Sequence, residues 1–576
     1  MFQRLRYCLS LLQSLPVLAL SLLVVGVPVQ VASAAERPGA TAIASAHPHA
    51  TAAGFEILAA GGNAFDAAVA VSAALAVVEP YGSGIGGGGF WLLHVATENR
   101  DVMIDGRERA PLAAHRDMYL DDAGNLIPGA SMNGPLAAGI PGEPAALVHL
   151  AEQYGRLPLA RSLAPAIRLA RAGFEVEAHY RRMAAFRRDV LRESADAARI
   201  FLREGEVPAE GVVIRQPELA DTLQALAGQG RDGFYAGKVA DRLVTGVRAA
   251  GGIWTQRDLD EYEVIEREPV RGEYHGMRIT SAAPPSSGGI ALVTMLNILE
   301  GYGLQDLCEV ERTHLIVEAM RRAYRDRAVY LGDTDYVEVP VAMLTSPHYA
   351  AGLRNGIRRD QATPSASLPG PEAFGGGNHT THFSILDREG NRVAATLSIN
   401  YPFGAGFVVP GTGVLLNDEM DDFSAKPGVP NAYGLVGTEA NAIAPGKRML
   451  SSMSPTFVET DDRVAILGTP GGSRIITMVL HGILGFAADK PVQDWVSEPR
   501  FHHQYLPDVI QFEPEAFGAE MQQQLKAMGH ELKPLDSSYG NMQAIQWNRA
   551  TGEVRAASDP RGIGEALIEH VGRVSP

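Results

Sequence analysis

The sequence predicts an α+β protein, in which amphipathic helices cover strands that have at least one buried face. Residues 380–400 read T-T-H-F-S-I-L-D, then the turn-like R-E-G-N, then R-V-A-A-T-L-S-I-N. This alternation around a glycine-containing turn is typical of a β-hairpin. Apolar residues at helical spacing predict helices at 64–78, 142–154, 162–172, 216–227, 289–299, 313–331 and 474–484.

Local signals justify individual elements. Asn63 follows two glycines and precedes the alanine-rich run 64–78, so it is the expected N-cap of a buried helix. For the longer helix at 313–331 we expect the Arg and Asp side chains on the outer face. The glycine run 84–89 fits neither phosphate-binding pattern and precedes an expected strand at 90–95. Its glycines therefore predict close approach of another layer of backbone.

The composition and charge narrow down the functional classes to which the protein can belong. The chain has 576 residues, of which 46% are apolar and 20% charged, so it can bury a sizeable core. The formal net charge is −16 and no basic cluster stands out, which argues against nucleic-acid binding. The 16 histidines are scattered without ligand spacing, and we expect no metal and no other cofactor.

The first 34 residues have the pattern of a secretory signal peptide. Arg4 and Arg6 form a positive start, an apolar run covers 9–31, and small residues at 32–34 offer a cleavage site. We expect an exported protein, periplasmic or secreted. An uncleaved membrane anchor is the alternative, because the apolar run approaches the length of a membrane span.

Two cysteines allow no internal disulfide in the mature chain. Cys8 lies in the expected signal peptide, which leaves Cys308 alone. A single cysteine without a paired motif is expected to be a small, buried apolar residue.

The predicted hairpin begins at Thr380, directly after a stretch rich in Pro, Gly, Ser and Ala at 355–377. If the bond between His379 and Thr380 is cut, Thr380 carries both a hydroxyl and a free α-amine. That amine has a reference pKa of about 7.7–8.0 and can accept the hydroxyl proton, as in N-terminal-threonine catalysis. A threonine at the start of a strand is also ordinary β-propensity, so the residues alone leave both interpretations open.

Other stretches have chemistry that suits a site around such a nucleophile. Arg107 or Arg109 offers a planar fork for a carboxylate, with a surface ion pair as the ordinary alternative. The run 417–424 holds four carboxylates and predicts either a solvated turn or a negative wall for an ammonium group. A Pro/Gly-rich loop centred on Tyr433 predicts a lid. The turn at 470–473 lies between an expected strand and helix, where backbone N–H groups can face an oxyanion.

Seven motifs occur in order along nearly the whole chain. They are G-G-N-A-x-D-A-A-V-A at 61–70, the glycine run 84–89, R-E-x-A-P at 107–111, T-T-H-x-S at 380–384, L-L-N-D-E-M-D-D-F-S at 415–424, S-S-M-S-P-T at 451–456 and P-G-G-S-R-I at 470–475. With these motifs the chain resembles the γ-glutamyltranspeptidase family of N-terminal nucleophile hydrolases.

The resemblance implies a four-layer αββα sandwich that is made as one precursor. The precursor would be cut between His379 and Thr380 into a large subunit, 35–379, and a small subunit, 380–576, which form one intertwined heterodimer. Thr380 would then attack the γ-amide of glutathione or another γ-glutamyl compound. The acyl group would pass to water or to an acceptor amino acid or dipeptide.

The resemblance also implies roles for the residues that hold the reacting carbonyl and the α-carboxylate of the substrate. Gly471 and Gly472 would donate to the oxyanion. Arg107, Ser451 and Ser452 would hold the glutamyl α-carboxylate.

The α-ammonium group of the substrate would be held by Asn400, Glu419 and Asp422. Many family members have Thr at the position of Ser398, so a hydroxyl near the nucleophile is kept. Some have Gln at the position of Glu419, and the extra carboxylate here is expected to strengthen ammonium binding or to shift the pH optimum. Tyr433 would belong to the lid.

Two other functions stay open at this point. A related amidase of dicarboxylic acyl groups, such as glutaryl cephalosporins, would share the fold and nucleophile but lack ammonium recognition. The presence of Asn400, Asp422 and the lid argues against it. An exported binding protein that never exposes Thr380 would remain a single uncut chain.

Overall fold

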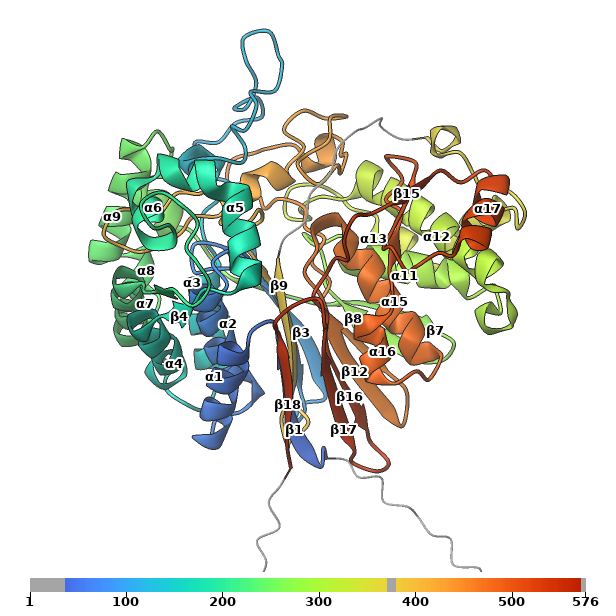
Figure 1. The fold of residues 1–576 in the computed structure, drawn as a ribbon, viewed down its shortest axis with the longest axis horizontal. Coiled ribbons are helices and arrows are strands. Elements are labelled where there is room, and N and C mark those ends of the chain that lie inside the picture. Colours follow the sequence, from blue (N-terminus) through green and yellow to red (C-terminus); the bar gives the residue numbers. More distant parts are fainter. Residues whose placement is uncertain (1–36, 370–379, 571–576) are drawn as a thin grey trace, which may run out of the picture. The chain divides into compact units, whose positions relative to one another are not determined.

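The computed structural model describes residues 37–369 and 380–570; the expected signal peptide and His379 lie outside these residues. Two β-sheets pack face to face, and helices cover the outer face of each sheet (Figure 1). This is the four-layer αββα sandwich that the sequence predicts. Among the described residues, no helix is long and apolar enough to cross a membrane.

The first sheet has seven antiparallel strands. In spatial order they are β18 (Glu565–His570), β1 (Ala40–Ser45), β9 (Thr381–Leu386), β10 (Arg392–Ser398), β2 (Gly88–Val95), β3 (Arg100–Gly106) and β6 (Ile265–Arg267). The strands β9 and β10 form the predicted hairpin, with Thr381 opposite Leu397. Strand β9 also pairs with β1, and β10 with β2, so segments from before and after Thr380 alternate within one sheet.

The second sheet has six antiparallel strands. Their order is β17 (Val554–Ser558), β16 (Gln543–Asn548), β12 (Arg463–Gly468), β11 (Thr456–Glu459), β8 (Met277–Ser281) and β7 (Val270–Tyr274). It faces the first sheet through contacts of β12 and β16 with β9 and of β12 with β10. Two small sheets lie outside the sandwich: β13 (Phe501–His502), β14 (Ile510–Phe512) and β15 (Leu532–Pro534), and β4 (Phe174–Glu175) with β5 (Val213–Ile214).

The helices divide between the two outer layers (Figure 1). On the side of the first sheet are α1 (Pro48–Ala59), α2 (Ala64–Val78), α3 (Glu143–Gln153), α4 (Leu159–Ala172), α5 (Ala178–Glu193), α6 (Ala195–Phe201), α7 (Pro217–Gln229), α8 (Asp232–Tyr235), α9 (Gly237–Ala249) and α10 (Gln256–Asp260). On the side of the second sheet are α11 (Gly288–Leu299), α12 (Glu309–Tyr330), α13 (Val341–Leu344), α14 (Pro347–Asn355), α15 (Ile475–Ala487), α16 (Val492–Ser497) and α17 (Ala519–Ala527).

The predicted cap of α2 is confirmed. The Asn63 side chain accepts hydrogen bonds from the backbone N–H groups of Phe65 and Asp66, each at 3.0 Å. The Asp66 carboxylate accepts in return from the Asn63 backbone N–H, also at 3.0 Å, which completes a capping box. Every residue of α2 is buried, so its start is fixed beneath the first sheet.

The expectation for the helix at 313–331 is wrong, because charged residues of α12 lie inside the protein. Arg321, Arg322 and Arg327 are all buried. Glu318 lies in the same helix and pairs with both Arg321 and Arg322, at 3.3 and 2.5 Å, which compensates their charges without water. Helices α11 and α17 pack against this helix, and Arg322 donates to the Leu353 carbonyl of α14 (Pro347–Asn355) at 3.1 Å, so its polar face meets protein rather than solvent.

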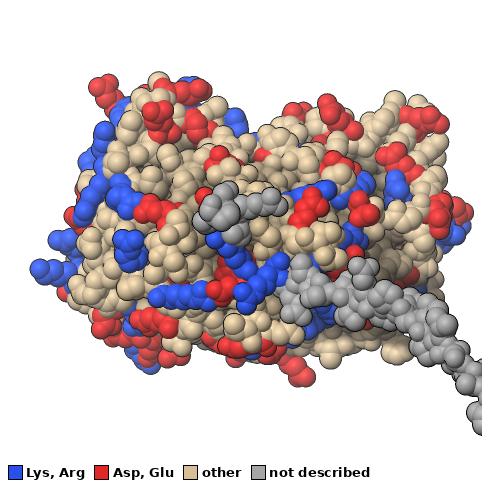
Figure 2. Space-filling model, turned by 90° about the horizontal axis from the view of Figure 1, so that it is seen from below, with Lys and Arg blue, Asp and Glu red and all other residues tan. Residues whose placement is uncertain are grey.

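The expectation for Cys308 is also wrong. Its side chain is exposed, because the residue caps the N-terminus of α12 at the end of a surface turn. On the face that Figure 2 shows, basic and acidic side chains lie side by side, in keeping with the dispersed charges of the sequence.

The glycine run before β2 allows the close backbone approach that the sequence predicts. A Cβ atom at Gly86 would lie 2.0 Å from the carbonyl oxygen of Leu415, and one at Gly87 would lie 2.2 Å from that of Ser398. Real Cβ atoms do not approach backbone so closely. The run is therefore packed directly against the segments that carry the candidate site.

We expect Gly86→Ala to destabilise the protein by more than the about 1–3 kcal/mol typical of overpacking, because the clash is with backbone. Gly84→Ala is the matched control, since its Cβ would meet only Ile399 at an ordinary 3.6 Å. Thermal unfolding of both variants checks this. Equal melting temperatures for the two would contradict the packing described here.

Candidate active site

Thr380 is half-buried and lies immediately before β9. It lines two cavities that have no other lining residue in common. One is small, with about 20 Å³ open, and the other is large, with about 620 Å³. Any chemistry at Thr380 therefore has both a tight pocket and a roomier one next to it.

The small cavity gathers most of the predicted site residues from distant parts of the sequence. Those that line it are Arg107, Thr380, Ser398, Asn400, Asp422, Tyr433, Ser451, Ser452 and Gly472. Of the remaining three, Glu419 contacts Arg107, Gly471 lines the large cavity beside Thr380, and His379 lies outside the described residues. The predicted residues thus surround one position.

Arg107 is the centre of a buried ion-pair cluster. It follows β3 and is only 1% exposed. Its Nη2 lies 2.6 Å from Asp422 Oδ2, and its Nη1 lies 3.0 Å from Glu419 Oε1 and 3.4 Å from Glu108 Oε2. Burial lowers the pKa of Arg107, but these three carboxylates outweigh burial and raise it, so the guanidinium stays charged. One cation thus faces three acids.

The acids of this cluster bind protons more readily than free side chains do. Burial raises the pKa of Glu419 to about 7, and the charge of Arg107 opposes that rise. Burial also raises the pKa of Asp422, again opposed by Arg107. Glu108, which sequence reasoning missed although it follows Arg107 directly, has a pKa raised well above its usual range by burial and by Glu419.

Hydrogen bonds fix Asn400 and the loop that contains Tyr433. The Asn400 backbone N–H donates to Ser398 Oγ at 2.7 Å, and its side-chain amide donates to the Asp418 carbonyl at 3.0 Å. Asn400 has φ +70°, a conformation that asparagine tolerates better than most residues. Tyr433 Oη donates to the Asn400 carbonyl at 2.8 Å, so the tyrosine of the expected lid is buried against the site.

The two serines are tied to buried partners. The Ser451 carbonyl accepts from the backbone N–H and the hydroxyl of Ser287, at 2.8 and 2.6 Å. Ser452 Oγ accepts from Arg327 Nη2 at 3.3 Å. Sequence reasoning missed Arg327, because it predicts the charged residues of α12 on the outer face.

Gly471 and Gly472 adopt backbone conformations that favour glycine, with φ +146° and +55°. A Cβ at Gly471 would lie 2.4 Å from Met478 Cε. Gly472 begins the 3₁₀ turn η6 (Gly472–Arg474), which leads directly into α15. Since Gly471 and Gly472 line the two cavities that Thr380 borders, they flank it from the N-terminal end of a helix.

The family model described as gamma-glutamyltranspeptidase matches residues 50–568 of this sequence. The chain belongs to the gamma-glutamyltranspeptidase family.

Individual relatives of this gamma-glutamyltranspeptidase family member span most of its length. A glutathione hydrolase proenzyme of Pseudomonas sp. (strain A14) is 46% identical over 83% of this chain and 84% of its own. That of Escherichia coli (strain K12) is 42% identical over 91% of this chain and 90% of its own. The solved structure of a cephalosporin acylase from Bacillus halodurans is 29% identical, with a TM-score of 0.81 over 92% of this chain and 96% of its own.

One further acid lies beside the candidate nucleophile of this gamma-glutamyltranspeptidase family member. Glu79, the C-cap of α2, is buried, and its Oε2 accepts from Thr381 Oγ1 at 2.6 Å. Burial raises its pKa to about 7, although the bond from Thr381 partly offsets this. Sequence reasoning missed it, because a single Glu after an alanine-rich helix carries no signal of its own.

Proposed function

We propose that the protein is a self-processing γ-glutamyltransferase and glutathione hydrolase with Thr380 as its nucleophile. The observation that supports this most is the small cavity, in which Thr380 faces the buried pair of Arg107 and Asp422. A γ-glutamyl group ends in an α-carboxylate and an α-ammonium. Its head group therefore needs one cationic and one anionic partner at a fixed distance from the reacting amide.

Maturation proceeds by attack of the Thr380 hydroxyl on the carbonyl carbon of His379. The peptide C–N bond breaks, Thr380 gains a free α-amine, and an ester joins its oxygen to the His379 carbonyl. Water then opens this ester. The products are a large subunit that ends at His379 and a small subunit that begins at Thr380, which stay together as a heterodimer.

Catalysis uses the same hydroxyl. The α-amine of Thr380 accepts the hydroxyl proton, the oxygen attacks the γ-carbonyl of glutathione or another γ-glutamyl compound, and the amine product leaves with a proton. The backbone N–H groups of Gly471 and Gly472 stabilise the negative oxygen of the tetrahedral intermediate. Water, an amino acid or a dipeptide then accepts the acyl group.

The charged groups of the substrate bind by replacing the ion pairs between Arg107 and its carboxylates. In the unliganded cluster Arg107 is paired with Asp422 and Glu419. The α-carboxylate of the substrate binds the guanidinium of Arg107 and displaces the protein carboxylates. The α-ammonium of the substrate then binds those carboxylates, so no buried charge is left uncompensated. Ser451 and Ser452 assist the carboxylate and Asn400 the ammonium. The protein does this work outside the cytoplasm, in the periplasm or as a secreted enzyme.

The decisive experiment combines intact mass and N-terminal sequencing of the purified protein with release of nitroaniline from a γ-glutamyl anilide. We expect a small chain that begins at Thr380, together with anilide turnover. A single uncut chain without turnover would instead support the alternative of an exported binding protein.

Similarity to the solved cephalosporin acylase favours a second candidate, an amidase of dicarboxylic acyl groups. Such an enzyme would also be cut at Thr380 but would accept glutaryl amides and ignore the α-ammonium. The acids around Arg107 argue for the γ-glutamyl substrate. Parallel assays with γ-glutamyl and glutaryl anilides separate the two, because they differ only in that ammonium group.

We expect Glu419→Gln to change the pH dependence of γ-glutamyl turnover. With a pKa of about 7, Glu419 is neutral below this pH and ionised above it. Only the ionised form attracts the substrate ammonium, so kcat/KM of the parent rises as the pH increases through about 7. In Glu419→Gln, kcat/KM should no longer rise near pH 7. It should still rise at higher pH, where the Thr380 α-amine loses its proton.

The control for that measurement is Asp421→Asn. Asp421 is another buried carboxylate on the same short helical turn, but it accepts from Ser131 Oγ at 2.6 Å and does not line the small cavity. We expect the rise near pH 7 to survive in this variant. Its survival in Glu419→Gln as well would remove Glu419 from ammonium binding.

A further inference from the structure

The two proposed oxyanion donors are the backbone N–H groups of Gly471 and Gly472. The first belongs to the peptide unit that begins with the Pro470 carbonyl, and the second to the unit that begins with the Gly471 carbonyl. Both peptide bonds are trans. Because a trans peptide is planar, its N–H and C=O point in opposite directions. A partner that holds the carbonyl therefore also sets the direction of the N–H.

The donor at Gly472 is oriented by a backbone hydrogen bond. The Gly471 carbonyl accepts from the Arg474 backbone N–H at 3.1 Å, within the turn η6. This bond joins backbone atoms only, and the turn continues directly into α15. The Gly472 N–H is thus fixed by the local fold of the chain and needs no side chain for its orientation.

The donor at Gly471 depends on a side chain instead. Thr469 Oγ1 donates to the Pro470 carbonyl at 2.9 Å, and Thr469 is fully buried. Gly471 itself, at φ +146°, has no Cβ that would restrict rotation of this peptide unit. The hydroxyl of Thr469 thus selects the orientation in which the Gly471 N–H points away from it.

The direction of the Thr469 hydroxyl is set in turn by Asn541. The Asn541 backbone N–H donates to Thr469 Oγ1 at 3.2 Å, so the hydroxyl proton is directed to the Pro470 carbonyl. The Asn541 side chain accepts from Gln543 Nε2 at 2.9 Å, and the Gln543 carbonyl accepts from Ser384 Oγ at 3.1 Å. Hydrogen bonds thus connect this turn with β9, the strand that follows the candidate nucleophile.

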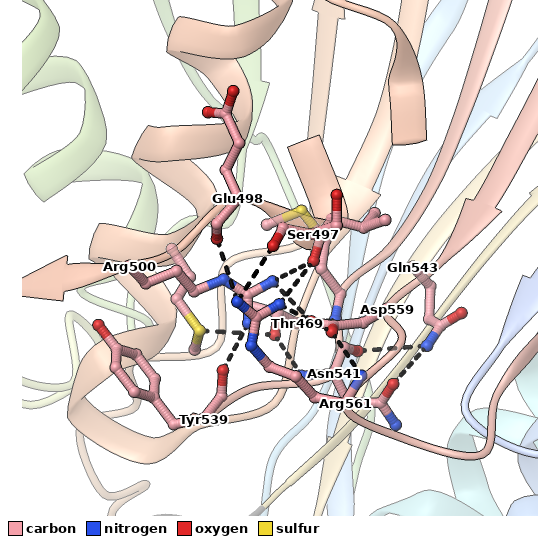
Figure 3. Close-up of polar contacts among 12 residues, drawn as sticks. Thr469, Ser497, Glu498, Arg500, Tyr539, Asn541, Gln543, Asp559 and Arg561 are labelled. Atoms are coloured by element: carbon pink, nitrogen blue, oxygen red, sulfur yellow. Dashed lines mark hydrogen bonds and ion pairs between the residues drawn. The ribbon is translucent and has the colours of Figure 1, made fainter. Parts of the chain in front are cut away.

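A buried ion pair holds the segment that contains Asn541 (Figure 3). Arg500 Nη2 pairs with Asp559 Oδ2 at 2.6 Å, and both side chains are almost fully buried. Arg500 Nη1 also donates to the Tyr539 carbonyl, and Asp559 Oδ2 accepts from the Met542 backbone N–H at 3.0 Å. The chain is therefore fixed on both sides of Asn541, which keeps its N–H in place.

We propose that Thr469 is a positioning residue for the oxyanion site, because its hydroxyl orients the peptide unit that carries the Gly471 N–H. The inference rests on the function proposed above. Thr469 lines neither of the two cavities beside Thr380, so it acts through this donor and not on the substrate. Without the hydroxyl, the Pro470 carbonyl loses this partner, and the N–H turns away from the developing negative charge.

The effect is expected in kcat rather than in KM. An oxyanion donor stabilises the tetrahedral intermediates, which form both when the acyl-enzyme is made and when it is opened. The ground-state substrate gains little from this donor, so both steps slow together and KM stays unchanged. Loss of a whole donor costs about 100- to 1000-fold in kcat, and a misaligned donor is expected to cost about tenfold.

The test compares Thr469→Val with Thr469→Ser in the release of nitroaniline from a γ-glutamyl anilide. Valine has nearly the shape of threonine but no hydroxyl, whereas serine keeps the hydroxyl. Turnover is calculated per cut chain, whose fraction is measured on a denaturing gel, so slower maturation does not count as slower turnover. We expect Thr469→Val to lower kcat about tenfold at unchanged KM, and Thr469→Ser to keep the kcat of the parent.

Thr294→Val is the matched control. Thr294 is also buried, but its hydroxyl donates to the Ile290 and Leu344 carbonyls of α11 and α13, at 2.8 and 2.9 Å. Its kcat should equal that of the parent. If Thr469→Val does not fold, Thr469→Ala and Thr469→Ser form a second pair that differs only in the hydroxyl.

Two results would overturn the inference: an equal kcat in the Thr469 variants with and without the hydroxyl, or an increase in KM alone. A parent that releases no nitroaniline would instead overturn the proposed function itself. The two failures are therefore distinguishable in the same assay.

Discussion

We expect Thr380→Ala to remain one uncut chain without γ-glutamyl turnover. In the function proposed above, the substitution removes the single oxygen that both breaks the bond to His379 and forms the acyl-enzyme. Loss of a covalent nucleophile costs several orders of magnitude in rate, about 10⁶-fold in well-studied hydrolases. Intact mass shows the uncut chain, and the anilide assay measures the loss.

Two further variants separate the roles of the adjacent threonines. Thr380→Ser keeps a hydroxyl and should still be cut, although more slowly. Thr381→Val removes the hydroxyl that donates to Glu79 but leaves Thr380 intact, so a cut chain is expected. Cleavage in Thr380→Ala, or a persistent precursor in Thr381→Val alone, would assign the nucleophile to Thr381 instead.

The second large effect is expected for Arg107→Lys. Lysine keeps the positive charge that Glu419 and Asp422 require, but it has no planar fork to bind two carboxylate oxygens at once. Loss of one or two charge-assisted hydrogen bonds, each worth about 1.5–3 kcal/mol, lowers kcat/KM for γ-glutamyl donors by about 100-fold. The effect should appear mainly in KM, because the carboxylate is bound equally in the ground and transition states.

Arg109 supplies the control for this substitution. It lies two residues farther on and donates to the Gly446 and Glu261 carbonyls, outside the small cavity. Arg109→Lys should leave KM for the donor unchanged. Arg107→Ala is a poorer probe, because it leaves buried carboxylates without their cation and is expected to destabilise the fold by about 3–5 kcal/mol. A parent-like KM in Arg107→Lys would remove this residue from carboxylate binding.

Local signals in the sequence were sufficient for many elements. The alternation after Thr380 predicted the hairpin of β9 and β10, and Asn63 predicted the start of α2. Both rest on interactions between residues close in the chain, which periodicity and capping rules describe directly.

The contacts within the site could not be predicted in the same way. Arg107 and Asp422 are 315 residues apart, and the resemblance implies a different part of the substrate for each, whereas the fold pairs them with each other. In α12, the charges of Arg321 and Arg322 predict exposure, yet both side chains are buried. The signal that could have corrected this was Glu318, at the spacing of three and four residues that lets one carboxylate serve both arginines inside the protein.

Segments from before and after Thr380 alternate in the first sheet. Refolding of this sheet is therefore expected to differ between the whole and the cut chain. While the chain is whole, β9 finds its place between β1 and β10 by a search within one molecule. Once the bond is cut, the same pairing requires two separate chains to meet, so recovery from full unfolding becomes dependent on concentration. The unprocessed Thr380→Ala chain should refold equally well at any dilution, whereas the mature enzyme should lose its ability to refold as it is diluted.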